Sequence, residues 1–309
     1  MKHLFTLLAL TVGFSMNAQL VSVVENGNTG QRLQTSNASN HGDIGDNAVD
    51  LSYSSSSSIT LGATGSNSTA MGSTTTASGS NSTAMGFITT ASGSNSTAMG
   101  RSTTASGVDS NAMGNRTTAS GKGSTAMGRS TTASGNYSTV MGDNTTASDY
   151  GSLVIGQFNL SGATVTNSAT QFNTANTAFV IGNGADGSNQ SDAFSVLFSG
   201  ETVIGSDLEV KGNVLISSDA RLKANIVSLG STLAKLLLID GKRYTMKKDG
   251  KQNIGVLAQD IQKVFPELVS TDDKEMLAVN YQGLVPVLIN ALKEQDAKMK
   301  EQEKRLERL

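Results

Sequence analysis

Residues 68–81 read STAMGSTTTASGSN, and five further stretches of fourteen residues repeat this pattern as far as residue 151. Each copy has Met-Gly at its fourth and fifth positions, so Met71 and Gly72 recur every fourteen residues up to Met141 and Gly142. A seventh, degenerate copy begins at Ser152. A fixed and short period of this kind predicts a solenoid in which each repeat forms one coil.

The composition of the repeat favours β-structure. Ser, Thr and Gly are poor helix formers, whereas short runs with Thr and Met between Gly and Asn are typical of strands and turns. We therefore predict two short strands and two turns per coil, with identical residues stacked about 4.8 Å apart. The Met ladder is expected to form the interior line. Because one large apolar residue per repeat offsets little of the entropy cost of ordering fourteen residues, the repeat also suggests an oligomer.

The spacing G-x-x-S-x-A-[MI]-G-x-x-T-x-A-S over residues 66–156 resembles the head repeat of trimeric autotransporter adhesins, the YadA-like heads. The resemblance implies a left-handed parallel β-roll, three copies of which pack around a threefold axis as a homotrimer. Three alternatives stay open. A calcium-binding β-roll needs Gly-Gly-x-Gly-x-Asp spacing, and an ice-binding ladder needs paired threonines on one face, whereas adjacent Thr75 and Thr76 point to opposite faces. The third is a disordered Ser/Thr-rich linker.

The regions around the repeats differ from them. Residues 1–18 combine a basic start, an apolar stretch too short to span a bilayer and a small-residue cleavage site, which predicts a signal peptide and a secreted or cell-surface protein. Residues 19–65 are expected to be a polar, partly ordered lead-in. Residues 157–217 are expected to be a β-rich connector, with strands near 179–182, 194–198, 202–205 and 208–216.

The charge of the chain is concentrated at its C-terminal end. Of its 309 residues only 16% are charged and the net charge is −2, which gives no reason to expect a nucleic-acid partner. Residues 1–217 hold 7 Lys/Arg and 12 Asp/Glu, whereas residues 218–309 hold 16 and 13. Two different kinds of chain therefore meet near residue 217. No later segment predicts a membrane span in the mature chain, and the chain has no Cys to form a disulfide.

Residues 218–309 begin with SDARLKANI and continue with GVLAQDIQKVFPELV at 255–269. This pair of motifs resembles the peptidase S74 domain, the intramolecular chaperone of endosialidase tailspikes and other trimeric fibres. The resemblance implies a small α+β domain that helps three chains assemble and then cuts itself off. It implies cleavage between Ser217 and Ser218, with Ser218 and Lys223 as the catalytic pair.

The residue chemistry is compatible with that implication. The predicted mature chain has one His, His41, and no Cys, so a Ser-His-Asp or Cys-His device is disfavoured. A serine hydroxyl needs a base, and a lysine serves as one only when its pKa is lowered. We expect Ser218 in the approach to a helix that carries Lys223, while Asp219 and Arg221 either pair with each other or take part in the site. The alternative without a catalytic role is an ordinary helix start capped by Ser218 or Asp219.

The C-terminal tail carries a heptad pattern. Apolar and Gln residues alternate at spacings of three and four, which predicts a coiled coil over about 284–309. The seam consists of Val285, Leu288, Leu292, Gln295, Met299, Gln302, Leu306 and Leu309. The alternative is a single amphipathic helix packed on its own domain.

Taken together, the sequence predicts a mainly β, exported homotrimeric fibre with a cleavable C-terminal assembly domain. Its enzymatic action would be a single self-cleavage, with no other substrate, no cofactor and no metal. A surface ligand is possible but no residue identifies it. The alternatives are a fibre whose C-terminal domain stays attached as a trimerisation clamp, and a glycan- or ice-binding repeat protein.

Overall fold

The computed structural model describes residues 20–247, 249–272 and 275–308, so the predicted signal peptide at 1–18 lies outside the described residues. The chain forms two compact units that meet between Lys211 and Gly212. The first unit is a stack of β-coils and the second is a small α+β unit. Each is described by itself below.

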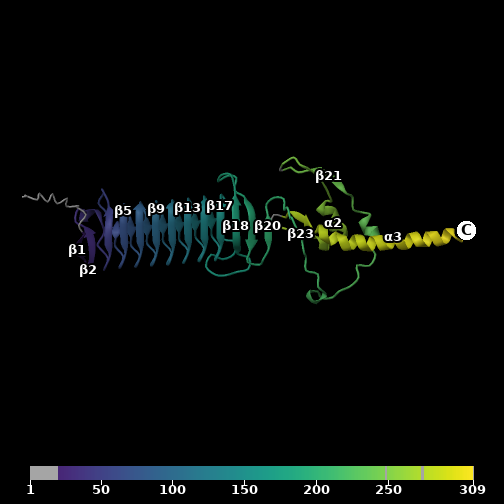
Figure 1. The fold of residues 1–309 in the computed structure, drawn as a ribbon, viewed down its shortest axis with the longest axis horizontal. Helices are drawn as coiled ribbons and strands as arrows, with labels where there is room; N and C mark the ends of the chain where they lie inside the picture. Colours follow the sequence, from purple (N-terminus) through teal and green to yellow (C-terminus); the bar gives the residue numbers. More distant parts are fainter. Residues whose placement is uncertain (1–19, 248, 273–274, 309) are drawn as a thin grey trace, which may run out of the picture. The chain divides into compact units, whose positions relative to one another are not determined.

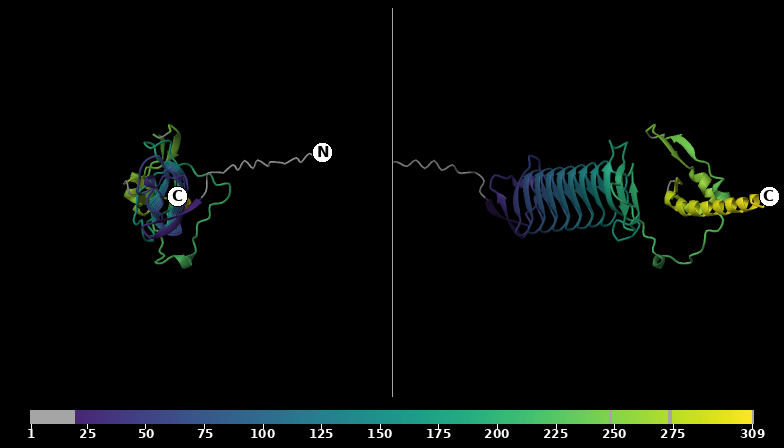
Figure 2. Two further views of the ribbon diagram at one scale, coloured as in Figure 1. Left: turned by 90° about the vertical axis from the view of Figure 1, so that its left-hand side faces the viewer. Right: turned by 45° about the vertical axis from the view of Figure 1, so that its right-hand side comes forward.

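The repeats form the predicted parallel solenoid, with two short strands and two turns in each coil (Figure 1, Figure 2). Residues that are fourteen apart pair in register, as Met85 does with Met99. The long strands are β5 (Thr69–Ser73), β7 (Thr83–Phe87), β9 (Thr97–Arg101), β11 (Asn111–Asn115), β13 (Thr125–Arg129), β15 (Thr139–Asp143) and β17 (Leu153–Gln157). The short strands are β4 (Gly62–Ala63), β6 (Thr76–Ala77), β8 (Thr90–Ala91), β10 (Thr104–Ala105), β12 (Thr118–Ala119), β14 (Thr132–Ala133) and β16 (Thr146–Ala147).

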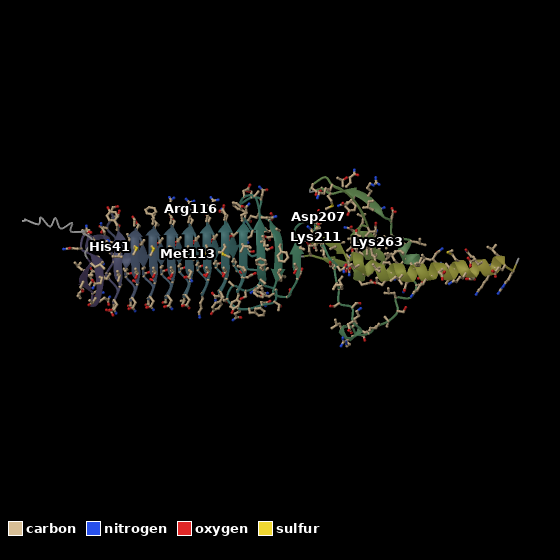
Figure 3. The ribbon with its side chains drawn as sticks, viewed as in Figure 1. His41, Met113, Arg116, Asp207, Lys211 and Lys263 are labelled. Carbon is tan, nitrogen blue, oxygen red and sulfur yellow. The ribbon has the colours of Figure 1, made fainter. Side chains whose placement is uncertain are left out.

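Small residues fill the inside of the coil, and the prediction of an interior Met ladder is wrong. Alanines such as Ala70 and Ala84 are fully buried, as is the Thr75 ladder. Met71 and Met99 are instead 37% and 40% exposed, and Figure 3 shows Met113 on the same ladder. Successive strand residues face opposite sides, so burying Ala turns the next residue, Met, outward. Each chain therefore presents a row of methionines on its surface.

Two glycine ladders set the close spacing of the coils. Gly100 has a φ of +124°, and a Cβ added there would overlap the carbonyl oxygen of Gly114 in the next coil. The second ladder includes Gly93, where a Cβ would overlap Gly107 O. Only residues without a side chain allow the backbones to stack this closely.

The predicted lead-in at 19–65 is ordered and covers one end of the solenoid. Strands β1 (Leu20–Glu25) and β2 (Asn28–Leu33) form a hairpin, and a 3₁₀ turn η1 (Ala38–Asn40) follows. Strand β3 (Val49–Tyr53) pairs with β5, so that Leu51 lies opposite Met71 in the methionine row. This segment forms a cap because some of its apolar residues, including Ile44 and Ala48, are buried in the same core as the alanines.

At the other end of the solenoid, Asp149 follows the last glycine of the Gly93 ladder. Its buried carboxylate accepts hydrogen bonds from Thr166 N and Thr177 N, each at 2.7 Å, and so holds the loop that leaves the coil. The predicted connector strands at 179–182, 194–198 and 202–205 are confirmed. They are β18 (Thr177–Asn183), which continues the parallel ladder, and β19 (Asp192–Leu197) and β20 (Thr202–Ile204), which pair antiparallel.

The predicted strand at 208–216 is wrong, because these residues form no strand. Their side chains are exposed, including Leu208, Val214 and Leu215. A strand needs a neighbouring edge for its backbone groups, and within the single chain the structure gives this segment none.

The second unit has a small core formed by Ile261, Phe265 and Val287. Its helices are α1 (Leu233–Leu236), α2 (Ala258–Val264) and α3 (Leu284–Leu306), with 3₁₀ turns η2 (Ala220–Leu222), η3 (Pro266–Leu268) and η4 (Tyr281–Gly283). Its strands form two hairpins, β21 (Lys242–Thr245) with β22 (Gln252–Gly255) and β23 (Val269–Thr271) with β24 (Leu277–Val279).

Helix α3 confirms the helix predicted from residue 284 onward and uses two faces. Val287 and Ala291 are buried against the rest of the unit. The predicted seam residues Leu288 and Leu292 lie on another side and are exposed, Leu292 by 71%. The helix thus packs on its own domain while its heptad seam stays uncovered. None of the helices in the described ranges is both long and apolar enough to cross a membrane.

Candidate functional site

The predicted cleavage segment forms a short turn. Ser217 and Ser218 lie in exposed, irregular chain just before η2. Asp219 caps this turn, since its side chain accepts a hydrogen bond from Arg221 N at 2.8 Å. Lys223 is the residue after the turn, and its N–H donates to Ala220 O at 3.0 Å. The expected helix carrying Lys223 is therefore a single 3₁₀ turn, with Asp219 as its cap.

This turn brings Ser218 and Lys223 together although they are five residues apart. Lys223 Nζ donates to Ser218 Oγ at 2.7 Å. Such a distance lies within the range for proton transfer between a nucleophile and its base.

Asp219 and Arg221 pair with each other, as one of the two alternatives predicted. Arg221 Nε and Nη2 donate to the two carboxylate oxygens at 3.0 and 2.7 Å. The hydrogen bond from the Arg221 side chain lowers the pKa of Asp219, and that from Arg221 N adds to the effect. The carboxylate is thus occupied by Arg221 next to the Ser218–Lys223 pair.

The surroundings of the pair are exposed and apolar. Leu215 and Ile216 precede it, and Leu222, Ile226 and Val227 surround or follow it, all of them exposed. Nothing in the single chain removes water from Lys223, because it too is exposed. Desolvation is the usual way in which a lysine pKa is brought down to the range of a general base.

Glu294, which the sequence interpretation did not single out, fixes the end of this exposed segment to α3. Its carboxylate accepts from Ser231 Oγ at 2.6 Å, from Leu233 N at 3.1 Å and from Thr232 N. The bond from Ser231 and those from the two backbone N–H groups lower the pKa of Glu294. Thr232 Oγ1 also donates to Val287 O at 2.9 Å. The sequence signal for this anchor is an acidic residue seven positions after Val287, on the face of α3 that packs on the unit.

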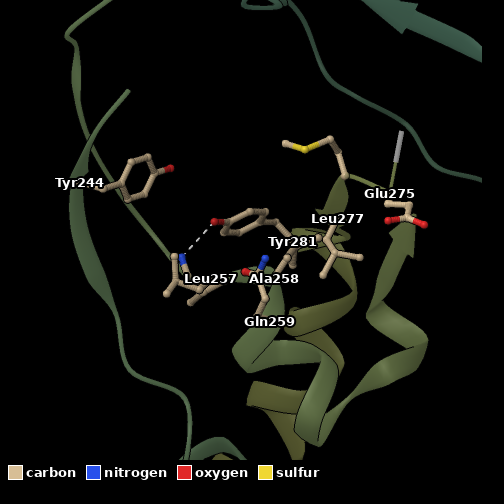
Figure 4. A pocket seen from close by; sticks show the side chains of 10 residues that line it. Tyr244, Leu257, Ala258, Gln259, Glu275, Leu277 and Tyr281 are labelled. Atoms are coloured by element: carbon tan, nitrogen blue, oxygen red, sulfur yellow. Dashed lines mark hydrogen bonds between the residues drawn. The ribbon is translucent and has the colours of Figure 1, made fainter. Parts of the chain in front are cut away.

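The second sequence motif lines a cavity of about 330 Å³ in the same unit (Figure 4). Leu257, Ala258 and Gln259, from GVLAQ, form one wall, while Tyr244 and Tyr281 form another. The Tyr281 hydroxyl accepts a hydrogen bond from Val256 N at 3.1 Å. The motif therefore builds a local structure, and Ser218 and Lys223 are not among the lining residues. In the described part of the chain no cluster of three or more His, Asp or Glu side chains could bind a metal ion.

Comparison with known families agrees with both motifs. A family model for the YadA head domain repeat matches the chain in five stretches between residues 63 and 159, of which the last four overlap. A second family model, described as the chaperone of endosialidase, matches residues 218–270 and so begins at Ser218. No curated protein gives a significant match. The chain is therefore similar to YadA head repeats over its solenoid and to the endosialidase chaperone over the start of its second unit.

Proposed function

We propose that this protein is an exported homotrimeric fibre or adhesin-like protein whose C-terminal unit drives assembly and then cuts the chain between Ser217 and Ser218. The observation that carries the cleavage proposal is the 2.7 Å contact between Ser218 Oγ and Lys223 Nζ. It occurs where the similarity to the endosialidase chaperone begins. The proposed units are the head repeats at 66–156, the connector at 157–217 and the assembly domain at 218–309.

The proposed chemistry starts when Lys223, as a neutral amine, takes the proton of the Ser218 hydroxyl. The Ser218 oxygen attacks the carbonyl carbon of Ser217, and the bond from that carbon to the Ser218 nitrogen breaks as the nitrogen takes up a proton. The product is an ester, which water hydrolyses to a Ser217 carboxylate and a free Ser218 hydroxyl. An attack by Ser218 of a neighbouring subunit would give the same two fragments.

Assembly would switch this chemistry on. In the single chain Lys223 is exposed to solvent, whereas a lysine needs desolvation or a neighbouring cation to serve as a base. The apolar side chains around it, including Leu215 and Val227, are exposed too. Burying them between chains would remove water from Lys223 and favour its neutral form. Cleavage would therefore follow trimer formation rather than precede it.

Two exposed apolar rows support self-association. One is the methionine row of the solenoid, which includes Met71 and Met99, and the other is the α3 seam with Leu288 and Leu292. Both repeat along straight elements, so that copies of the chain can pack along their length. In the proposed trimer three left-handed β-rolls share the methionine rows and three α3 helices share the seam.

The cleavage test compares variants of the intact chain by mass spectrometry and denaturing gel. The wild-type protein should give fragments that correspond to residues 19–217 and 218–309. Ser218→Ala and Lys223→Met should remain as one chain, while the matched control Ser217→Ala keeps the nucleophile and should still cleave. Fragments of unchanged mass from Ser218→Ala would refute the proposed nucleophile.

The runner-up is a fibre whose C-terminal unit stays attached as a permanent clamp. It predicts an intact wild-type chain that is nevertheless trimeric. The same gel, combined with the sedimentation of the native protein, separates the two proposals. In either case the first unit is the part that would meet an external ligand.

A further inference from the structure

A polar cavity of about 290 Å³ lies in the cap of the solenoid, between the chain after β2 and the chain after β3. Its volume is at the small end of the range of ligand cavities, roughly 300–1,000 Å³, which fits one small molecule. Figure 3 shows His41 at this end of the coil. The lining residues include hydroxyl and amide side chains, one imidazole, one aromatic ring and one leucine.

His41 is the decisive residue of this cavity. Its side chain is only 1% exposed, yet it lines the cavity. Its Nδ1 lies 3.0 Å from Asp50 Oδ2 and 3.3 Å from Ser52 Oγ. Its other ring nitrogen, Nε2, has no hydrogen-bond partner within the described residues. A ring nitrogen without a protein partner at the wall of a cavity is available to a ligand group.

The position of His41 is fixed by Asp50 and its partners. Asp50 is fully buried, and its Oδ1 accepts from Ser52 N at 3.0 Å and Ser52 Oγ at 2.5 Å. Arg32 Nε lies 3.4 Å from Asp50 Oδ2, and Arg32 is itself bound by two hydrogen bonds to Glu25. Asp50 Oδ2 thus faces Nδ1, which leaves Nε2 as the ring nitrogen that can bond to a ligand. Asp50 Oδ2 and Ser52 Oγ both lie against the same ring nitrogen of His41, Nδ1, so the cluster is not a Ser-His-Asp relay.

The remaining lining is suited to a ligand with many hydroxyls and an apolar side. The hydroxyls of Thr35, Ser36 and Ser55 make no hydrogen bond within the described residues. Leu33 and the exposed ring of Tyr53 supply apolar surface. No Lys or Arg lines the cavity, which disfavours an anion, and the hydroxyl groups disfavour a wholly apolar ligand.

We propose that this cavity binds one uncharged sugar unit, with His41 Nε2 hydrogen-bonded to a ligand hydroxyl. Thr35, Ser36 and Ser55 surround the other hydroxyls, and Tyr53 faces the apolar side of the ring. The proposal does not rest on cleavage or on the chemistry of Ser218. It assigns a ligand to the cap, where the sequence indicated only polar chain.

The test measures binding of methyl glycosides of glucose, galactose, mannose, N-acetylglucosamine and N-acetylgalactosamine to the intact protein by saturation-transfer NMR. Ser55→Trp blocks the cavity from an exposed position without removing a buried group. The control is Ser94→Trp, an exposed turn position whose ladder already carries Tyr150. Circular dichroism confirms that both variants are folded.

We expect at least one glycoside to bind, Ser55→Trp to weaken its binding by about tenfold or more, and Ser94→Trp to leave it unchanged. In protein labelled with ¹⁵N-histidine, the same glycoside should shift the His41 Nε2 resonance. The proposal is overturned if none of the five glycosides binds at millimolar concentration. It is equally overturned if Ser55→Trp binds as tightly as the wild type, or if Nε2 does not respond.

Discussion

Replacing Gly100 by Ala should open the solenoid near its middle. The residue has a φ of +124°, and an added Cβ would overlap Gly114 O and lie 3.0 Å from the Gly114 carbonyl carbon. Holding a non-glycine residue at such a φ costs about 1–3 kcal/mol. Relieving the overlap requires β9 and β11 to separate, which weakens ladder hydrogen bonds worth about 0.5–1.5 kcal/mol each. We therefore expect the free energy of unfolding to fall by about 2–5 kcal/mol per chain.

Two other glycines provide graded controls. Gly123 has a φ of +62°, and a Cβ there would meet only the side chain of Tyr137. Asp109 and Tyr137 occupy the equivalent positions of the neighbouring coils, each with a φ of 59°, so Gly123→Ala should cost no more than about 1–2 kcal/mol. Gly187→Ala has nothing within 4 Å of its added Cβ and should be nearly neutral.

Urea denaturation followed by circular dichroism gives the global free energy, and amide hydrogen exchange gives the opening free energy coil by coil. The loss in Gly100→Ala should be greatest at the amides of β9 and β11. If the free energies of Gly100→Ala and Gly187→Ala agree to within about 0.5 kcal/mol, the steric explanation of the glycine ladder is wrong.

Three further perturbations test other parts of the molecule. Thr103 is fully buried and its hydroxyl has no partner within the described residues, so Thr103→Val should raise the free energy of unfolding by about 1 kcal/mol in urea titrations, and a loss would contradict this reading. Leu292 is 71% exposed in the single chain, so burying it in a seam between chains would contribute up to about 1.5–3 kcal/mol per chain. Leu292→Ala should therefore reduce the yield of trimer in sedimentation, whereas the control Lys293→Ala should not. Equal trimer yields from the two variants would argue against the seam. Burial of Asp50 opposes its ionisation, but its hydrogen bonds with His41 and Ser52 outweigh this effect and lower its pKa below 3.8. The stabilising effect of the carboxylate is therefore present at neutral pH and is lost as the pH falls through the lowered pKa. Asp50→Asn should remove this acid dependence of the unfolding free energy, and an unchanged acid profile would exclude Asp50 as its source.

The fourteen-residue period predicts the coil, its two strands and its in-register stacking, because a repeat imposes the same contacts on each copy. The period does not determine which side of a strand faces inward. Met71 follows Ala70 directly, so either could be interior on spacing alone. The interior takes Ala because the coil is thin and is filled by the methyl and hydroxyl groups of Ala, Thr and Ser.

The candidate site could be predicted only where the residues are close in sequence. Ser218 and Lys223 lie five residues apart, and one turn is enough to join them. His41, Asp50 and Arg32 are scattered through polar sequence and meet only after β2 and β3 have paired. The segment at 208–216 has a strand-like sequence but forms no strand, because it has no strand partner in its own chain. Its local pattern could not predict this absence of a partner.

The in-register stacking of identical coils also makes the length of the solenoid an adjustable quantity. Each coil contacts only the coils before and after it, and the two ends are closed by separate structures, the β1–β3 cap and the loop held by Asp149. Tandem duplication or loss of forty-two nucleotides within the repeats would lengthen or shorten the stack by about 4.8 Å without altering either end. Versions of this chain with different repeat numbers would therefore differ in the length of the first unit while keeping the same cap and the same second unit.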